Sequence, residues 1–127
     1  MKRDMELVRE ILLFLEDENR EYYDDKETDG YKLIHIDGYT REEVEYHLMI
    51  MLDGGLITGQ LPRADDGYTT HRFVRLDWNS HDFIQTFRDD TVWNKAKSHL
   101  KDKGLQIANM PMDILIELGK SYIKGLF

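Results

Sequence analysis

The sequence predicts a mixed α+β fold, and two neighbouring features of its first half carry that prediction. Thr40 and Glu43 form a capping box that opens a helix, and Gly54 with Gly55 ends that helix. Two strand-like segments joined by a turn follow directly as a β-hairpin. A helix that ends in an apolar-Gly-Leu-Ile step before a hairpin is typical of a winged helix-turn-helix, because the chain leaves the helix through a left-handed residue before it enters the wing. We therefore expect a winged-helix core (helix, short strand, helix, β-hairpin wing) with a C-terminal helical extension.

Length and composition indicate a single globular domain. The chain has 127 residues, of which 41% are hydrophobic and 33% are charged. Chains of this length rarely divide into separate cores, so we expect one domain over residues 1–127, with the winged-helix core at 1–77 and the helical extension at 78–127 packed on it. Cysteine is absent, which excludes disulfides and thiolate chemistry. No stretch has the roughly 18 apolar residues that a membrane span needs, and we expect a cytoplasmic protein of a bacterial host cell.

The N-terminal part of the chain predicts a helix, a loop and a short strand. Asp4 is the expected N-cap of a helix that ends near Asp17. The apolar stripe of this helix consists of Met5, Val8, Ile11, Leu12 and Leu15. Residues 21–30 are too polar to bury a face and predict a loop, whereas residues 32–36 predict a short strand.

The middle of the chain predicts the second helix and the hairpin. The capping-box helix covers residues 41–53, and its buried face is expected to consist of Val44, His47, Leu48, Met51 and Leu52. Residues 56–61 and 71–76 predict the two strands, with residues 62–68 as a long tip between them. Because His47 lies on the apolar face, we expect a core histidine whose ring nitrogens are satisfied.

The C-terminal part predicts helices. Ser80 is the expected cap of one long helix that ends near Gly104, with a kink near Asp90, a residue suited to capping a new turn. Pro111 predicts the start of the last helix, whose expected buried side chains are Ile114, Leu115, Leu118 and Tyr122. Trp78 and Trp93 are expected to be core anchors that hold the extension onto the wing.

Charge is divided unevenly along the chain. The formal net charge is −8, from 17 basic and 25 acidic side chains. Residues 1–60 hold 7 basic and 16 acidic side chains, a net of −9, whereas residues 61–127 hold 10 and 9, a net of +1. Non-specific affinity for duplex DNA comes mainly from phosphates neutralised by Lys and Arg. Any DNA contact therefore has to come from local basic positions in the second half of the chain.

The hairpin holds the basic residues best placed for DNA. In a winged helix the wing contacts the DNA backbone or the minor groove, and arginine side chains hold phosphate oxygens well. The candidates for DNA contact are Arg63, His71, Arg72, Arg75 and, at the start of the 41–53 helix, Arg41. The alternative is a solvated wing whose arginines pair with neighbouring acids.

The 41–53 helix suggests a second hypothesis, a protein contact. Its outward face is expected to carry Glu42, Glu45, Tyr46, Met49 and Asp53. Base contacts usually come from Arg, Lys, Asn or Gln, and phosphates repel carboxylates, so this helix is a poor DNA reader. An exposed aromatic ring and a flexible thioether among acids suit a protein interface. The partner would be a host protein, a phage protein or a second copy of the chain.

No motif predicts catalysis, a cofactor or a metal. The five histidines, at positions 35, 47, 71, 81 and 99, include no i, i+4 pair, whereas a zinc site needs three or four converging ligands. Ser80, His81 and Asp82 are the residue types of a catalytic triad, but adjacent side chains point in different directions. Gly54 and Gly55 follow a helix, whereas a phosphate-binding loop precedes one. We expect a non-enzymatic binding protein without a cofactor.

Several segments of the chain resemble a family of bacterial and phage proteins catalogued as a domain of unknown function, DUF2513. The resembling segments are residues 1–12 (MKRDMELVREIL), 38–40 (GYT), 46–47 (YH), 55–57 (GLI), Trp78 with 81–83 (HDF), and 88–93 (RDDTVW). The resemblance spans nearly the whole chain and implies a phage or prophage context, but it implies no catalytic or binding residues. At residues 77–80 (DWNS) the chain departs from the Thr-Trp-Glu-Gly-like step expected there.

Two hypotheses of function follow. The first is a phage or prophage transcription regulator, or another DNA-associated protein, that contacts duplex DNA through Arg63, Arg72 and Arg75 as a dimer. The second is an acidic protein-interaction module that uses the 41–53 helix and does not touch DNA. The composition of that helix favours the second hypothesis, and the usual role of the fold favours the first.

Overall fold

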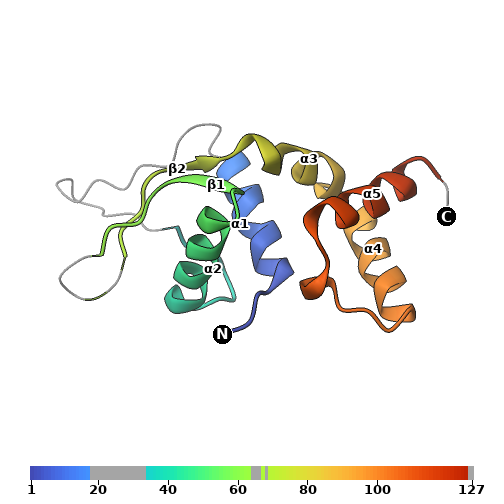
Figure 1. Cartoon of the computed structure of the whole chain (residues 1–127), viewed down its shortest axis with the longest axis horizontal. Coiled ribbons are helices and arrows are strands. Elements are labelled where there is room, and N and C mark those ends of the chain that lie inside the picture. The colour runs from blue at the N-terminus through green and yellow to red at the C-terminus, as the bar shows by residue number, and fades with distance from the viewer. Residues whose placement is uncertain (18–33, 64–66, 68, 126–127) are drawn as a thin grey trace. The chain divides into compact units, whose positions relative to one another are not determined.

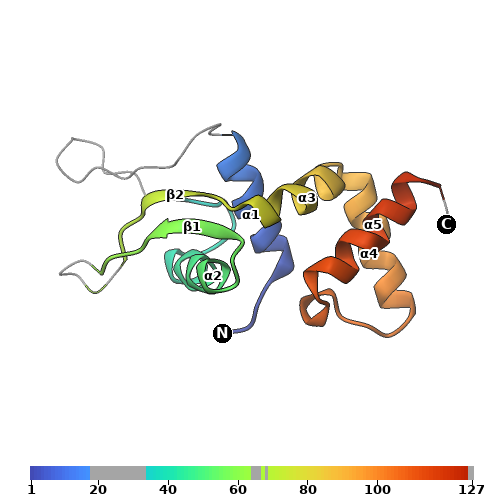
Figure 2. The same ribbon diagram turned by 45° about the horizontal axis from the view of Figure 1, so that its top comes forward.

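The structure is a computed structural model that describes residues 1–17, 34–63, 67 and 69–125. Within these residues the chain is a mixed α+β protein with five α-helices and one two-stranded antiparallel hairpin, which confirms the predicted class (Figures 1 and 2). The chain divides into two compact units, Met1–Ser80 and His81–Phe127. The division into a core at 1–77 and a packed extension stays a prediction. The loop expected over residues 21–30 lies outside the described residues.

Helix α1, Met5–Asp17, begins at the cap that the sequence predicts. The Asp4 carboxylate oxygen Oδ1 accepts hydrogen bonds from the backbone N–H groups of Glu6 (2.9 Å) and Leu7 (3.4 Å). These are amides that the helix itself leaves without a partner. The predicted apolar stripe is buried along its whole length, together with Leu7.

Helix α2, Arg41–Asp53, has the predicted capping box at its start. The Thr40 hydroxyl accepts from the Glu43 amide (3.1 Å), and the Glu43 carboxylate accepts from the Thr40 amide (3.0 Å). Gly54 ends the helix, and Gly55 then takes the left-handed conformation (φ 76°) that leads the chain into the hairpin. Both predicted boundaries of this helix are confirmed.

Strands β1, Ile57–Gln60, and β2, Arg72–Leu76, form the predicted hairpin. An isolated bridge between Arg63 and Thr69 extends the pairing toward the tip. The strand expected at residues 32–36 is not found over its described part, Ile34 to Ile36. There the Ile34 amide donates to a histidine ring nitrogen of the hairpin instead of to a strand carbonyl.

The core of the first unit lies between the hairpin and the two helices. Helix α1 contacts β2 and α2, while α2 contacts β1 and lies beneath it in both views (Figures 1 and 2). His47 is buried in this core. Its Nδ1–H donates to the Glu43 carbonyl oxygen (2.8 Å), and its Nε2 accepts from the Asp4 amide (2.8 Å). The prediction of a satisfied core histidine is confirmed.

The prediction of a single long helix after the hairpin is wrong, because the structure has two helices there. Helix α3 is Trp78–Phe87 and helix α4 is Asp90–Asp102. Asp89 separates them: its backbone is extended and its carboxylate accepts from the Thr91 amide (2.7 Å), so Asp89 is the cap and Asp90 is not. Ser80 is not a cap either, because it lies inside α3 and its hydroxyl donates to the Leu56 carbonyl oxygen.

The second unit is closed by helix α5, Met112–Ile123, which follows Pro111 as predicted and packs on α4 after the short 3-10 helix η1, Ile107–Asn109. Phe83, Phe87 and Trp93 form an aromatic cluster in its core. Close packing extends to Gly119, where an added Cβ would lie 2.7 Å from the Phe87 ring. The unit therefore has an apolar core of its own.

Four burial predictions for the C-terminal part are corrected. Trp78 is 86% exposed and is no core anchor, whereas Trp93 is buried as predicted. In α5, Leu115 is buried as predicted, but Ile114 is 48% exposed and Leu118 and Tyr122 are half-buried. A periodic apolar pattern does not say which side of a wide stripe meets the core. No helix within the described ranges is long and apolar enough to span a membrane.

Candidate nucleic-acid interface

The hairpin brings three of the predicted arginines to the surface. Arg63, Arg72 and Arg75 are all exposed. The register places Arg72 opposite Gln60 and Arg75 opposite Thr58. The Nε–H of Arg75 donates to the Thr58 hydroxyl across the strands (3.1 Å), and this bond holds the guanidinium on the outer side of the sheet. The three arginines predicted to contact DNA therefore lie on the same hairpin.

An irregularity in the hairpin presents an aromatic ring beside these arginines. Between the Thr58–Arg75 and Gln60–Arg72 pairs, β2 has one residue more than β1, so Phe73 and Val74 stand opposite Gly59 alone. Phe73 has a φ of 56°, which is rare for an aromatic residue, and its side chain is 46% exposed. Gly59 is required opposite it, because an added Cβ would lie 2.9 Å from the Val74 Cα.

Exposed aromatic residues next to the arginines are functional candidates that our sequence reasoning missed. Phe73 follows Arg72 directly, and the highly exposed Trp78 comes three residues after Arg75. A signal for them was present: residues 72–78 (RFVRLDW) interleave basic and aromatic side chains. That pattern is typical of surfaces that bind unpaired bases.

His71 lies in the interior and is not placed to contact DNA. Its side chain is 1% exposed, and its Nδ1 accepts from the Ile34 amide (3.0 Å). The other nitrogen, Nε2, has no hydrogen-bond partner among the described residues. Burial, together with the charge of Arg41, lowers the pKa of His71 from 6.5 to about 4. The ring is therefore neutral at physiological pH and fastens the chain before α2 to the hairpin.

Arg41 and Glu45 form an internal tie between α2 and the hairpin. The Arg41 Nε lies 3.4 Å from a Glu45 carboxylate oxygen, and that oxygen also accepts from the Thr69 amide (2.9 Å). The Arg41 side chain is 34% exposed and that of Glu45 is 14% exposed. This tie turns Glu45 away from the outer face of the helix, whereas Arg41 stays partly exposed at the start of α2.

The other residues of the predicted protein-binding face differ in their exposure. Glu42, Met49 and Asp53 are exposed on α2. Tyr46 is half-buried. Its ring meets the His47 ring edge to face, with the two ring centroids 5.5 Å apart. A groove of about 280 Å³ lies beside this face, between α2 and the hairpin. It is lined by Met49, Leu52, Asp53, Leu61, Arg63 and Thr69.

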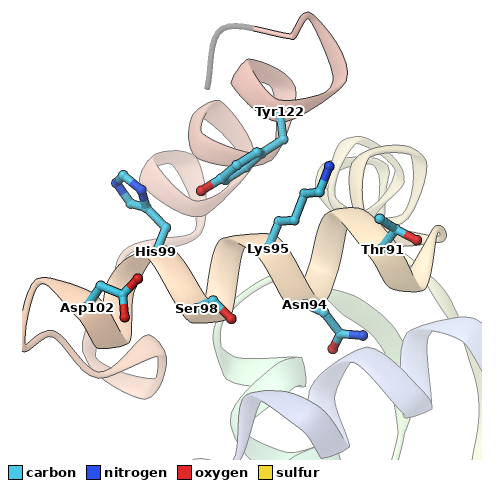
Figure 3. A pocket seen from close by; sticks show the side chains of 7 residues that line it. All are labelled: Thr91, Asn94, Lys95, Ser98, His99, Asp102 and Tyr122. Carbon is cyan, nitrogen blue, oxygen red and sulfur yellow. The ribbon is translucent and has the colours of Figure 1, made fainter.

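A second hollow, of about 420 Å³, lies on α4 and α5 in the second unit (Figure 3). It is lined by Thr91, Asn94, Lys95, Ser98, His99, Asp102 and Tyr122. Lys95, His99 and Tyr122 lie toward one side of α4 and Asn94 toward the other, while Asp102 stands at the far end from Thr91 (Figure 3). The rings of His99 and Tyr122 meet edge to face in this hollow, with their centroids 6.1 Å apart.

The described residues offer no set of metal ligands. Among them, no group of three or more His, Asp or Glu side chains lies close enough together to hold a metal ion. His47 and His71 use ring nitrogens in hydrogen bonds to the backbone. The exposed arginines and aromatic residues of the hairpin are therefore the most distinctive surface feature of the first unit.

Comparison with known proteins places the chain in a family without assigning an activity. A family described as "Hypothetical protein (DUF2513)" matches residues 2–106. An "Uncharacterized protein" of Haemophilus influenzae is 32% identical over 127 residues, which cover 99% of this chain and 98% of that protein. No solved structure matches the chain.

Proposed function

The chain belongs to the family described as hypothetical protein (DUF2513), and we propose that it is a non-enzymatic DNA-associated protein whose hairpin contacts duplex DNA. The observation that carries the proposal is the exposure of Arg63, Arg72 and Arg75 on one hairpin. Arginine side chains on a projecting hairpin suit phosphate oxygens, because each guanidinium offers several donors in a fixed plane.

The arrangement of the first unit supports a wing-led mode of binding. Helix α1, helix α2 and the hairpin follow one another as in a winged helix, the assignment that we propose for this unit. The exposed acids Glu42 and Asp53 disfavour the entry of α2 into a groove. We infer that the hairpin makes the contact and α2 stays outside the groove. We further propose a transcription-regulatory role in a phage or prophage context, in the cytoplasm and as a homodimer.

Fluorescence anisotropy of a mixed-sequence duplex, titrated at low and moderate salt, tests this proposal. If each of the three arginines neutralises one phosphate, log K falls with log salt with a slope of about −3. The triple variant Arg63→Glu, Arg72→Glu, Arg75→Glu should not bind. Its matched control makes the same charge change on exposed lysines of the second unit, as Lys95→Glu, Lys101→Glu, Lys103→Glu. Flat traces for the wild type at low salt, or equal losses in both variants, would exclude binding through the hairpin.

The groove beside α2 favours a second candidate function, a protein contact that does not involve DNA. Met49, Leu52 and Leu61 supply apolar lining between the charges of Asp53 and Arg63, a combination common at protein interfaces. The variant Met49→Lys places a charge in this lining. If it abolishes capture of a host or phage protein while the triple arginine variant does not, α2 and its groove carry the function.

A further inference from the structure

We propose that the outer surface of β2 stacks on unpaired bases, so that the preferred ligand is DNA with a single-stranded stretch. Phe73 and Trp78 would hold the bases, and Arg72 and Arg75 the phosphates on either side. This inference rests on the proposed function, because it narrows the ligand of the same hairpin. It goes further in naming what the aromatic residues do.

The backbone of Phe73 is the first observation. Its φ of 56° lies in the region that favours glycine, and the position is the extra residue of a bulge, where glycine often takes this conformation. A phenylalanine here strains the backbone, and 46% of its side chain remains exposed to water. Nearly half of this residue therefore remains accessible to a ligand. Strained residues of this kind cluster at binding sites, where the strain holds a group in place for its ligand.

The neighbours of Phe73 indicate which ligand would cover the ring. Exposed guanidinium groups precede and follow it at Arg72 and Arg75, and no acid lies between Arg72 and Leu76 in the strand. An anionic chain that also carries flat apolar faces matches this alternation. Single-stranded nucleic acid is such a chain, since each nucleotide supplies one phosphate and one base.

Trp78 extends the same chemistry beyond the end of the strand. It stands at the first position of α3 with 86% of its side chain exposed. Closed duplex offers little to these rings, because neighbouring base pairs already cover each base. Unpaired bases have open faces, and stacking on an aromatic side chain contributes to binding without regard to sequence.

The test compares two labelled DNAs by anisotropy: a closed duplex, and the same duplex with an internal stretch of unpaired bases. We expect the second to bind at least about five-fold tighter. The variant Phe73→Gly removes the ring and relieves the backbone, so it should remain folded and yet lose this preference. Its control is Ile114→Ala, which removes a side chain of similar exposure (48% against 46%) from the second unit.

Tryptophan emission gives a second readout. Trp93 is buried and Trp78 is exposed, so binding of the unpaired DNA should quench the emission, and Trp78→Phe should remove the quench while still offering a ring. Two results would overturn this inference and leave the duplex proposal standing. One is equal affinity for the closed duplex and for the duplex with unpaired bases, and the other is an unchanged preference for unpaired bases in Phe73→Gly. A protein that binds neither DNA would overturn both.

Discussion

Two buried histidines show how single residues hold the first unit together. His47 joins the start of α1 to α2, and His71 joins Ile34 to the hairpin. In each case one ring nitrogen accepts a hydrogen bond from a backbone amide, so that nitrogen carries no proton. The two rings use different tautomers, because His47 accepts through Nε2 and His71 through Nδ1. Protonation of His71 at Nδ1 would turn this acceptor into a donor that faces the Ile34 amide, another donor.

For His71 this gives a pH dependence of stability. Its pKa is about 4 in the folded protein and 6.5 in the unfolded chain, so the unfolded chain binds more protons between these values. The contribution to stability is fully present above pH 6.5 and is lost as the pH falls toward 4. Between pH 7 and pH 5 the free energy of unfolding should drop by about 2 kcal/mol from this group.

Urea denaturation at the two pH values, followed by circular dichroism, measures this drop. The control is His71→Asn, whose side-chain oxygen can still accept from the Ile34 amide but does not titrate. The carboxylates respond to acid in both proteins, so the difference in pH dependence between the wild type and the variant belongs to His71. An equal pH dependence in the variant would show that the ring does not carry the effect.

Individual elements depend on a few caps and close approaches. The break between α3 and α4 comes from one side chain, because the carboxylate of Asp89 accepts from the Thr91 amide. Asp89→Ala should lower the free energy of unfolding by about 1 kcal/mol. Asp90→Ala removes a charge in the first turn but leaves this capping bond in place, so it should cost less than Asp89→Ala. Thermal denaturation of the two variants checks the order, and a larger loss in Asp90→Ala would contradict this assignment of the cap.

The hairpin depends in the same way on Gly59. Its φ of 140° disfavours a side chain, and an added Cβ would also meet Val74 Cα at 2.9 Å and the Arg72 carbonyl oxygen at 3.0 Å. Gly38 has a similarly unusual φ of 87° but has no atom within 4 Å of the Cβ position. Gly38→Ala should therefore cost about 1 kcal/mol from the backbone alone, and Gly59→Ala should cost about 2 kcal/mol or more. Equal losses in chemical denaturation would mean that the strands separate to admit the Cβ.

At the scale of the whole molecule, the arginines of the hairpin form a small basic area on an acidic unit. Met1–Ser80 contains 10 basic and 19 acidic side chains, a net of −9, whereas His81–Phe127 contains 7 and 6, a net of +1. Long-range repulsion from the acidic remainder weakens non-specific attraction to DNA. Contacts through the hairpin therefore have to be local, which favours a ligand with several complementary features over a uniform polyanion.

The division into two units predicts separate responses to mutation. An added Cβ at Gly119 would lie 2.3 Å from the Thr86 methyl group and 2.7 Å from the Phe87 ring, so Gly119→Ala should destabilise the second unit by about 1–3 kcal/mol. Hydrogen exchange should then quicken in α4 and α5, while α1, α2 and the hairpin keep their protection and the proposed binding of DNA by the hairpin is unaffected. Faster exchange throughout both units would mean that they unfold together.

Local signals in the sequence were sufficient for several features of this fold. The Asp4 cap, the Thr40–Glu43 capping box, the glycine pair after α2 and the two strands all follow from short patterns, because a helix cap or a turn needs only neighbouring residues. The membership in the DUF2513 family also follows from sequence alone. The prediction of Asp90 as a cap was wrong, because the neighbouring Asp89 satisfies the same short pattern.

The sequence by itself determined the α+β class, the helices α1, α2 and α5, and the hairpin that carries Arg63, Arg72 and Arg75. Only the tertiary structure decided which side chains are buried and which are exposed. His71 and Glu45 turn inward to meet backbone amides of distant segments, while Trp78 stays exposed and the bulge opposite Gly59 presents Phe73. The physical reason is the separation along the chain of the residues that interact. Caps and periodicity depend on residues within a few positions, whereas the burial of a side chain depends on what the rest of the chain places against it.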